Sequence, residues 1–240
     1  MTSNNPRERL SRPAAEVIVR LPAIGRLMIT ARQSGATHER IGRVERIVHE
    51  DGMLLCQGAE HDSRIDPSEI ATVTVDRTSI MGDKAYPRID FADDAGTVLF
   101  SVVGFDGLEP FDMALAPLGG GVVLPVEARP ERGERGEVAS DDVGALPFAQ
   151  ASATGEPVSI LFSRRGFSQA WHGTIEQVKP AMGFINVMRP DFHLHLKAGT
   201  VAGWTRTEAQ GSVELSAVDF DGEPTGLVAT GRASAFQKAH

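Results

Sequence analysis

The chain has 240 residues, 41 % of them hydrophobic, which is enough for one large domain or two small ones with buried cores. Lys and Arg number 24 against 32 Asp and Glu, and the net charge of −8 argues against broad electrostatic binding to nucleic acid or an anionic membrane. The single cysteine, Cys56, excludes an internal disulfide and is expected to be buried and inert. Without a signal peptide or a span-length apolar stretch, we expect a cytoplasmic protein with no membrane insertion.

Short β-rich runs separated by turn residues dominate the first half of the chain. Residues 1–20 are expected to be irregular, with the first dozen poorly ordered and structure starting near Leu21. Apolar residues at helical spacing predict a short helix over residues 108–118. The strands predicted before this helix are residues 26–31, 42–49, 52–55, 71–76, 88–91 and 98–105.

A polar segment and a second β-rich region follow. Residues 119–157 contain three consecutive glycines, several prolines and nearly cancelling charges, which is typical of a flexible linker. The second unit is predicted over residues 158–236. Its strands are expected at residues 158–163, 168–178, 184–188, 192–196, 201–205, 213–218 and 226–230.

An internal repeat organises these elements. Residues 35–73 repeat without a gap at residues 166–204, at a constant offset of 131, with identical pairs such as Gly42/Gly173 and Glu45/Glu176. The repeat predicts two copies of one unit, residues 21–118 and 158–236, that pack as a pseudo-twofold dimer. We therefore expect an α+β fold, mostly antiparallel β with a few short helices.

Both copies are predicted to end in a hairpin. Asp-rich turns at residues 93–96 and 219–222 mark these hairpins, at an offset of 126 rather than 131. The difference indicates a deletion in the second copy between Trp204 and Val213, where a loop is expected.

The most concentrated candidate site residues are His193 and His195. Residues two apart on a strand point to the same face, so both imidazoles are expected to lie opposite Phe192, Leu194 and Leu196. A His-x-His pair can ligate a metal ion or a heme iron through neutral nitrogens. The alternative is the ordinary polar face of an amphipathic strand.

Basic residues supply the other candidates. At the offset of 131, His195 corresponds to Arg64, which can donate to an anionic or iron-bound ligand or pair with Asp62 or Asp66. Arg32 belongs to a group of arginines near His38 that can bind carboxylates, although a solvated sheet face needs such residues equally. No nucleophile motif, phosphate-binding loop, dinucleotide fingerprint or cysteine-rich metal spacing is present, so the sequence shows no signature of a common enzyme class.

Several longer segments of the sequence resemble one known family. They are "GFSQAWHGTIEQV" at residues 166–178, "KPAMGFINVMRPDFHLHLKAGTVAGW" at residues 179–204, "LPAIGRLMITARQSGATHERIG" at residues 21–42 and "RIDFADDAGTVLFSV" at residues 88–102. These segments resemble the hemin-degrading, HemS- and HmuS-like heme-utilisation family, which includes the shorter ChuX and HutX type. His38, Glu39 and Gly42 match residues of the family's N-terminal motif.

The resemblance implies a tandem repeat that holds one heme in a cleft between its halves, with a histidine on one side and an arginine on the other. Arg64 matches the expected arginine. The relatives' histidine lies in or near the segment joining the repeats, and residues 119–157 contain no histidine. The iron ligand is therefore expected to be His193, His195 or His38, with arginines such as Arg32 meeting the propionates.

Two function classes follow from these expectations. The first is a cytoplasmic heme-binding protein that stores, transfers or helps degrade heme, with a heme importer or a heme-accepting protein as its partner. Its heme-degrading activity would rest on the resemblance alone, since no catalytic constellation is visible. The second is a duplicated binding or interaction module that has lost heme.

Overall fold

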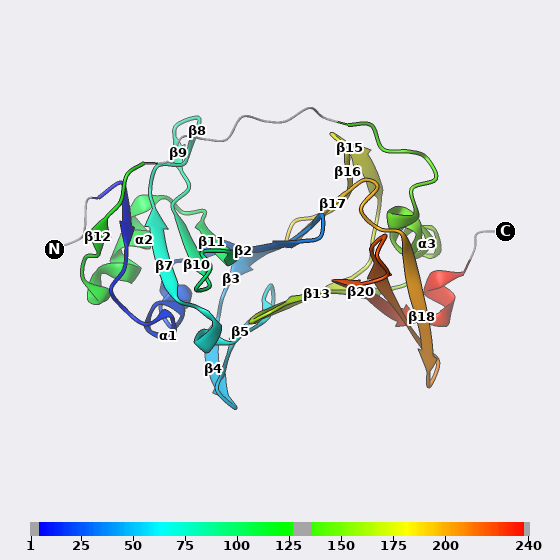
Figure 1. The fold of residues 1–240 in the computed structure, drawn as a ribbon, viewed down its shortest axis with the longest axis horizontal. Helices are drawn as coiled ribbons and strands as arrows, with labels where there is room; N and C mark the ends of the chain where they lie inside the picture. The colour runs from blue at the N-terminus through cyan, green and yellow to red at the C-terminus, as the bar shows by residue number, and fades with distance from the viewer. Residues whose placement is uncertain (1–4, 127–135, 238–240) are drawn as a thin grey trace. The chain divides into compact units, whose positions relative to one another are not determined.

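The protein consists of antiparallel strands with a few short helices, an α+β fold, as the sequence predicts (Figure 1). The computed structural model describes residues 5–126 and 136–237. Within these residues two compact units can be distinguished, and neither is continuous in the chain. Unit 1 contains residues 5–31, 40–126 and 165–168, and unit 2 contains residues 32–39, 136–164 and 169–237. The predicted domain boundaries, which follow the chain without interruption, remain a prediction.

Unit 1 is built on an antiparallel sheet with the strand order β12-β1-β7-β10-β11-β2. These strands are β1 (Arg7–Arg9), β2 (Arg26–Gln33), β7 (Thr72–Asp76), β10 (Arg88–Ala92), β11 (Val98–Gly104) and β12 (Val122–Val123). A second group has the order β6-β5-β4 and comprises β4 (Arg46–Glu50), β5 (Met53–Gln57) and β6 (Asp62–Ile65). A small separate hairpin is formed by β8 (Ile80–Met81) and β9 (Lys84–Ala85).

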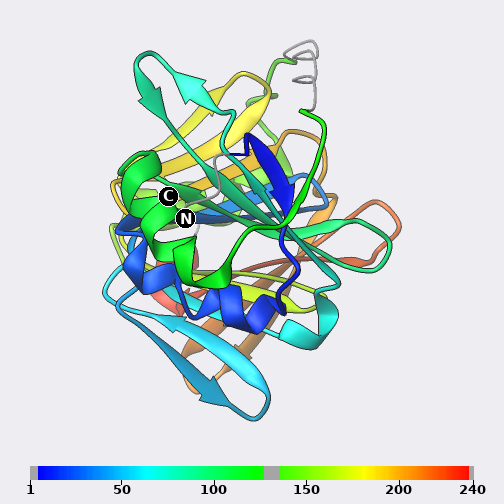
Figure 2. The same ribbon diagram turned by 90° about the vertical axis from the view of Figure 1, so that its left-hand side faces the viewer.

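Helical turns cover part of unit 1. They are α1 (Ala14–Ile18), η1 (Leu21–Ala23), η2 (Pro67–Glu69), α2 (Leu108–Leu115) and η3 (Ala116–Leu118). Helix α2 packs against η1, and both lie on the side of unit 1 that faces the viewer in Figure 2. The helix predicted over residues 108–118 is confirmed as α2 followed by η3, with Phe111, Leu115 and Leu118 buried.

The N-terminal segment is more ordered than the sequence suggested. Strand β1 pairs with both β7 and β12, and the side chains of Val17 and Ile18 in α1 are fully buried. The expectation of a poorly ordered first dozen was therefore wrong for residues 7–9, and residues 1–4 lie outside the described part. A three-residue strand and a five-residue helix are too short to show a clear hydrophobic period, so only their tertiary contacts reveal them.

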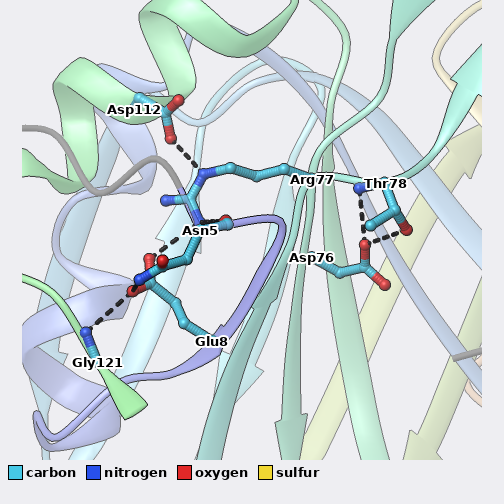
Figure 3. A network of polar contacts seen from close by, with 7 residues as sticks. All are labelled: Asn5, Glu8, Asp76, Arg77, Thr78, Asp112 and Gly121. Carbon is cyan, nitrogen blue, oxygen red and sulfur yellow. Dashed lines mark hydrogen bonds and ion pairs between the residues drawn. The ribbon is translucent and has the colours of Figure 1, made fainter. Parts of the chain in front are cut away.

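A buried ionic network ties β1 to the rest of unit 1 (Figure 3). The guanidinium of Arg77 donates to Asp112 Oδ1 at 2.7 Å and to Glu8 Oε1 at 2.9 Å. It also donates to the carbonyl of Asn5 at 3.0 Å, while Glu8 Oε2 accepts from the Gly121 amide at 3.0 Å. The side chains of Arg77 and Glu8 are only 9 % and 1 % exposed. Water reaches neither charge well, so each charge is stabilised mainly by its partner.

Unit 2 contains two groups of strands. The tip of the β2–β3 hairpin, where β3 spans Ala36–Arg43, is followed in the sheet by β17-β16-β15, and a second group has the order β18-β19-β20-β13-β14. The further strands are β13 (Val158–Arg164), β14 (Phe167–Gly173), β15 (Val178–Ala181), β16 (Phe184–Arg189), β17 (Phe192–Lys197), β18 (Gly203–Ala209), β19 (Ser212–Val218) and β20 (Pro224–Arg232). Trp171 stacks on Phe192 at 4.6 Å between ring centroids, within this unit's core.

Part of the predicted linker is structured. Residues 143–154 form η4 (Val143–Ala145) and α3 (Leu146–Thr154), and Phe148 and Ala151 of α3 are fully buried. A further short helix, η5 (Ala233–Phe236), packs against α3. Flexibility was thus the wrong expectation for residues 143–154. Their few apolar residues are enough to hold α3 in place, because the rest of unit 2 covers them. Residues 127–135 of the predicted linker lie outside the described part.

The duplication is visible in individual hydrogen bonds. In unit 2 the Lys197 amide donates to the Gly35 carbonyl at 2.9 Å, and in unit 1 the Asp66 amide donates to the Gly166 carbonyl at 3.0 Å. Both donors and both acceptors are related by the offset of 131. Gly35 and Gly166 also have positive φ angles, 82° and 71°, and leave no room for a Cβ. Equivalent hairpin turns therefore make equivalent contacts in the two units.

The second predicted offset is confirmed as well. The amides of Asp93 and Asp219 donate to the carbonyls of Thr97 and Glu223, both at 3.0 Å, so the two closing hairpins have matching turns. The loop expected between Trp204 and Val213 is reduced to a tight turn. Strands β18 and β19 continue to a tight turn at residues 210–211, where the first copy has the longer segment with β8 and β9.

Two predicted strands are interrupted in the structure. The strand expected over residues 42–49 is divided between β3, which ends at Arg43, and β4, which begins at Arg46. The strand expected over residues 168–178 is similarly divided between β14 and β15. Val44 and Ile175, which are equivalent at the offset of 131, are buried in these breaks, so the apolar pattern continues while the strand pairing changes.

Candidate functional site

The two histidines of β17 share one face of their strand, as predicted. Phe192, Leu194 and Leu196 are buried on the opposite face. The side chains of His193 and His195 are 26 % and 30 % exposed, and their ring centroids lie 5.9 Å apart. Strict alternation of apolar and polar residues thus presents both imidazoles together at a partly accessible surface of unit 2.

A carboxylate joins the histidines from a distant part of the sequence. Glu39 lies on β3, which neighbours β17 in the sheet. Its Oε2 atom is 3.1 Å from His193 Nδ1 and 3.9 Å from His195 Nε2. One ligand atom from each of Glu39, His193 and His195 lies within 4.8 Å of the other two, so the three side chains can bind one metal ion.

Asn186 orients the ring of His195. Its side-chain nitrogen donates to the carbonyls of Lys179, Ala181 and Phe184, at 2.9, 3.3 and 2.9 Å. The Asn186 Oδ1 atom therefore faces His195 Nδ1, 2.6 Å away, and can only accept. The proton of a neutral His195 must then be on Nδ1, which leaves the lone pair on Nε2.

The surroundings favour the neutral form of His195. Burial lowers the pKa of this imidazole, and the neighbouring His193 and the charge of Arg32 lower the pKa further, while Glu39 opposes the shift. A neutral imidazole is the form that ligates metal ions, because protonation removes the lone pair. Arg32, a residue predicted for propionate binding, is thus close enough to influence His195 electrostatically, and its carbonyl accepts from Arg164 at 2.8 Å.

His38 lies in the core of unit 2. Its side chain is fully buried, its Nε2 is 3.2 Å from the Ile160 carbonyl, and its Nδ1 accepts from Gln169 at 2.9 Å. The ring also packs against Phe192 at 4.8 Å between centroids. Both ring nitrogens are therefore engaged, which gives His38 a structural role, and its prediction as an iron ligand gains no support from this position.

Arg64 lies on β6 in unit 1, and its side chain is about half exposed. It is 3.6 Å from Glu50 on β4, and not paired with Asp62 or Asp66, the two partners considered from the sequence. Asp66 instead caps η2 by accepting from the Ser68 amide at 2.9 Å. An exposed pair of this kind leaves the Arg64 guanidinium accessible to solvent and to a ligand.

Other chemically interesting groups lie outside the cluster formed by Glu39, His193 and His195. Cys56 is buried, and burial raises the pKa of its thiol to about 12, so it is inert as predicted. An open groove of about 450 Å³ in unit 1 is lined by Arg26, Met28, Tyr86 and Phe105, among others. A second groove, of about 520 Å³, lies beside His172 in unit 2. None of the site residues predicted from the sequence lines either groove.

Two residues of the site, Glu39 and Asn186, had no assigned role in the sequence analysis. Glu39 was noted only as part of a motif, because its sequence separation from β17 hides their proximity. Asn186 was missed, although the repeat carries a signal: its equivalent at the offset of 131 is Leu55, and a polar residue replacing an apolar one beside His195 marks a difference between the copies.

Solved structures with the same fold are known. The heme-degrading enzyme ChuS of Escherichia coli O157:H7 superposes with a TM-score of 0.76 at 18 % identity, over 99 % of this chain and 84 % of ChuS. PhuS, a heme-binding protein from Pseudomonas aeruginosa, matches in its apo form with a TM-score of 0.73 at 18 % identity, over 97 % of this chain and 82 % of PhuS. The chain has the ChuS and PhuS fold.

The resemblance inferred from the sequence is therefore confirmed at the level of the fold. The match to the heme-bound form of PhuS has the same TM-score, 0.73, and covers 99 % of this chain. No family model and no curated protein sequence matches the chain. Among the described residues, no helix is long and apolar enough to cross a membrane.

Proposed function

We propose that this protein binds heme and acts in the cytoplasmic storage or transfer of heme. The observation that carries the proposal is the fold shared, over nearly the whole chain, with ChuS and PhuS, which are described as a heme-degrading enzyme and a heme-binding protein. The partners of this role would be heme itself and a heme importer or a heme-accepting protein.

The chemistry of His195 fits a ligand of heme iron. Its Nε2 carries the lone pair, and Asn186 holds the ring through Nδ1. Arg32, which acts electrostatically on His195, is the proposed partner of a propionate. Bound iron protoporphyrin would supply the redox chemistry, while these side chains bind and orient it. The resemblance adds Arg64 as a proposed heme contact from the first copy.

Titration with hemin tests the proposal. We expect a Soret shift that saturates at one heme per chain, and a large loss of affinity in His195→Ala. His172→Ala is the matched control, because His172 is a histidine of unit 2 that bonds to Ser159 and lies outside the cluster. Arg32→Ala and Arg64→Ala test the two arginines separately. Absence of a Soret shift in the wild-type protein would refute heme binding, and an unchanged His195→Ala variant would refute the ligand assignment.

Heme breakdown is a second candidate, favoured by the fold match to the heme-degrading ChuS. Incubation of the heme complex with a reductant and oxygen separates the two roles. Storage or transfer predicts that the Soret band persists and that heme passes intact to an acceptor such as apomyoglobin. Breakdown predicts loss of the Soret band, a linear tetrapyrrole product and released iron, which a ferrous chelator measures.

A further inference from the structure

We propose that Glu39, His193 and His195 form a binding site for a single divalent transition-metal ion, taken up as the bare ion and not as heme. The inference goes beyond heme binding and does not depend on it. It rests on the donor set, on the support of each donor by its neighbours and on the access of solvent to the cluster.

The donor set consists of two imidazoles and one carboxylate. Two histidines with one carboxylate are a common ligand set for Zn²⁺ and for non-heme Fe²⁺. The three ligand atoms lie within 4.8 Å of one another, and two of the separations are 3.1 and 3.9 Å. Small side-chain movements are therefore enough to bring all three atoms to an ion. Imidazole nitrogens also select against Mg²⁺ and Ca²⁺, which prefer oxygen ligands.

Each donor is held by the fold. Asn186 accepts a hydrogen bond from Nδ1 of His195, so the lone pair of this ring is on Nε2. His193 Nδ1 lies 3.1 Å from a carboxylate oxygen that can only accept, so it carries a proton in the metal-free protein. For Nδ1 to bind a metal ion, the ring would have to carry its proton on Nε2 instead.

Glu39 is held by backbone structure. It lies on β3, next to the turn at Gly35, and the Lys197 amide at the end of β17 donates to the Gly35 carbonyl at 2.9 Å. This hydrogen bond joins the hairpin to the end of β17, and the Glu39 carboxylate lies 3.1 Å from His193 Nδ1. Preorganised ligands of this kind lose little conformational freedom on binding.

The cluster is accessible to an ion and leaves coordination positions open. The side chains of Glu39, His193 and His195 are 13 %, 26 % and 30 % exposed. A fully enclosed structural zinc site has four protein ligands, whereas three protein ligands and solvent access are typical of sites that keep a position for water or another small ligand. The proposed ion would therefore be exchangeable and would carry bound water.

The equivalent positions of the other copy lack both imidazoles and the orienting amide, and Asp62 provides their one carboxylate. At the offset of 131, Glu39, His193, His195 and Asn186 correspond to Ala170, Asp62, Arg64 and Leu55. The same strand register is present, since Arg64 lies opposite Leu55 as His195 lies opposite Asn186. The fold alone does not require these polar residues, so their joint presence in one copy points to a ligand.

The test is titration of the heme-free, tag-free full-length protein with Zn²⁺ by calorimetry, followed by Co²⁺ as a spectroscopic probe. We expect one high-affinity Zn²⁺ per chain and Co²⁺ absorption bands that Zn²⁺ abolishes. Glu39→Gln, His193→Gln and His195→Gln should each lower the Zn²⁺ affinity by at least ~10-fold. His172→Gln should leave the affinity unchanged, and Mg²⁺ should not compete.

Two results would overturn the proposal. One is the absence of stoichiometric Zn²⁺ binding to the wild-type protein. The other is wild-type affinity in all three ligand variants, with circular dichroism spectra showing that they are folded. Glu39→Gln preserves side-chain size, so at least this variant should fold normally. A chain that binds Zn²⁺ but not hemin would refute the proposed function and support the metal site, and the reverse result would do the opposite.

Discussion

Strands β6 and β17 are equivalent parts of the two copies, yet one presents an exposed ion pair and the other a cluster of potential metal ligands. Arg64 on β6 reaches Glu50, with both side chains about half exposed. His195 on β17 is held by Asn186 and faces Glu39. The pleat and the pairing are the same, so the difference arises from a few side chains on one face.

The buried faces of the two units differ in a similar way. Unit 1 places His61 in its core, where the equivalent residue of unit 2 is Phe192. Unit 1 also contains the network in which Arg77 bonds to Asp112 and Glu8. Unit 1 thus carries the buried Arg77 network and a histidine where unit 2 has Phe192, whereas unit 2 carries the partly exposed Glu39, His193 and His195.

Among the variants that test the difference between the two units, Arg77→Ala in unit 1 should have the largest effect on stability. It leaves the carboxylate of Glu8 buried without its cation, and Asp112 loses the same partner. Removing one partner of a buried ion pair costs about 3–5 kcal/mol of unfolding free energy. Urea denaturation measures this loss. A loss below about 1 kcal/mol would show that the network is not part of a cooperative core.

His61 should make the stability of unit 1 sensitive to acid. The pKa of His61 is lowered from 6.5 to about 4, chiefly by burial and also by the charge of Arg40, while the Gly42 backbone opposes the shift. The folded-state pKa lies below the unfolded one, so the unfolded state binds the extra proton between these values. The free energy of unfolding should therefore fall by about 3 kcal/mol as the pH drops from 6.5 to 4.

The control for this pH dependence comes from the other copy. His61→Phe introduces the residue type that occupies the equivalent position in unit 2, and it removes the titrating group. Unfolding free energies measured across this pH range should then depend less on pH than those of the wild-type protein. An equal dependence in both proteins would assign the acid sensitivity to other groups.

Exchanging single residues between the copies tests which side chains make the metal site. Asn186→Leu gives β16 the residue found at the equivalent position of β5, and His195 loses its orienting acceptor. We expect the Zn²⁺ affinity to fall by roughly 10- to 100-fold, the usual effect of removing a partner that orients a ligand. The double variant Asp62→His/Arg64→His should gain no comparable affinity, because Ala170 and Leu55 offer neither a carboxylate nor an orienting amide.

Arg64→Ala should have the smallest effect on stability. Its pair with Glu50 is exposed on both sides, and such pairs contribute about 0–1 kcal/mol. Denaturation should therefore hardly distinguish this variant from the wild-type protein, while hemin titration tests the separate proposal that Arg64 contacts heme. A large loss of stability would mean that Arg64 supports the packing of β6.

Much of the fold could be predicted from the sequence, because most strands here alternate cleanly and because the repeat relates one half to the other. The face of β17 that carries His193 and His195, the helix over residues 108–118 and the matching hairpin turns were all predictable in this way. The structured N-terminus and α3 were not, since short helices carry weak periodic signals and are stabilised by contacts with distant residues.

The duplication, the strand faces and the pair of histidines can be read from the sequence, because each depends only on local alternation and on spacing along the chain. The residues that contact those histidines are visible only in the folded protein. Glu39 reaches them from a hairpin far away in sequence, and Asn186 reaches them across a strand pair whose register depends on the whole sheet. Contacts between distant segments follow from packing, and no local pattern specifies them.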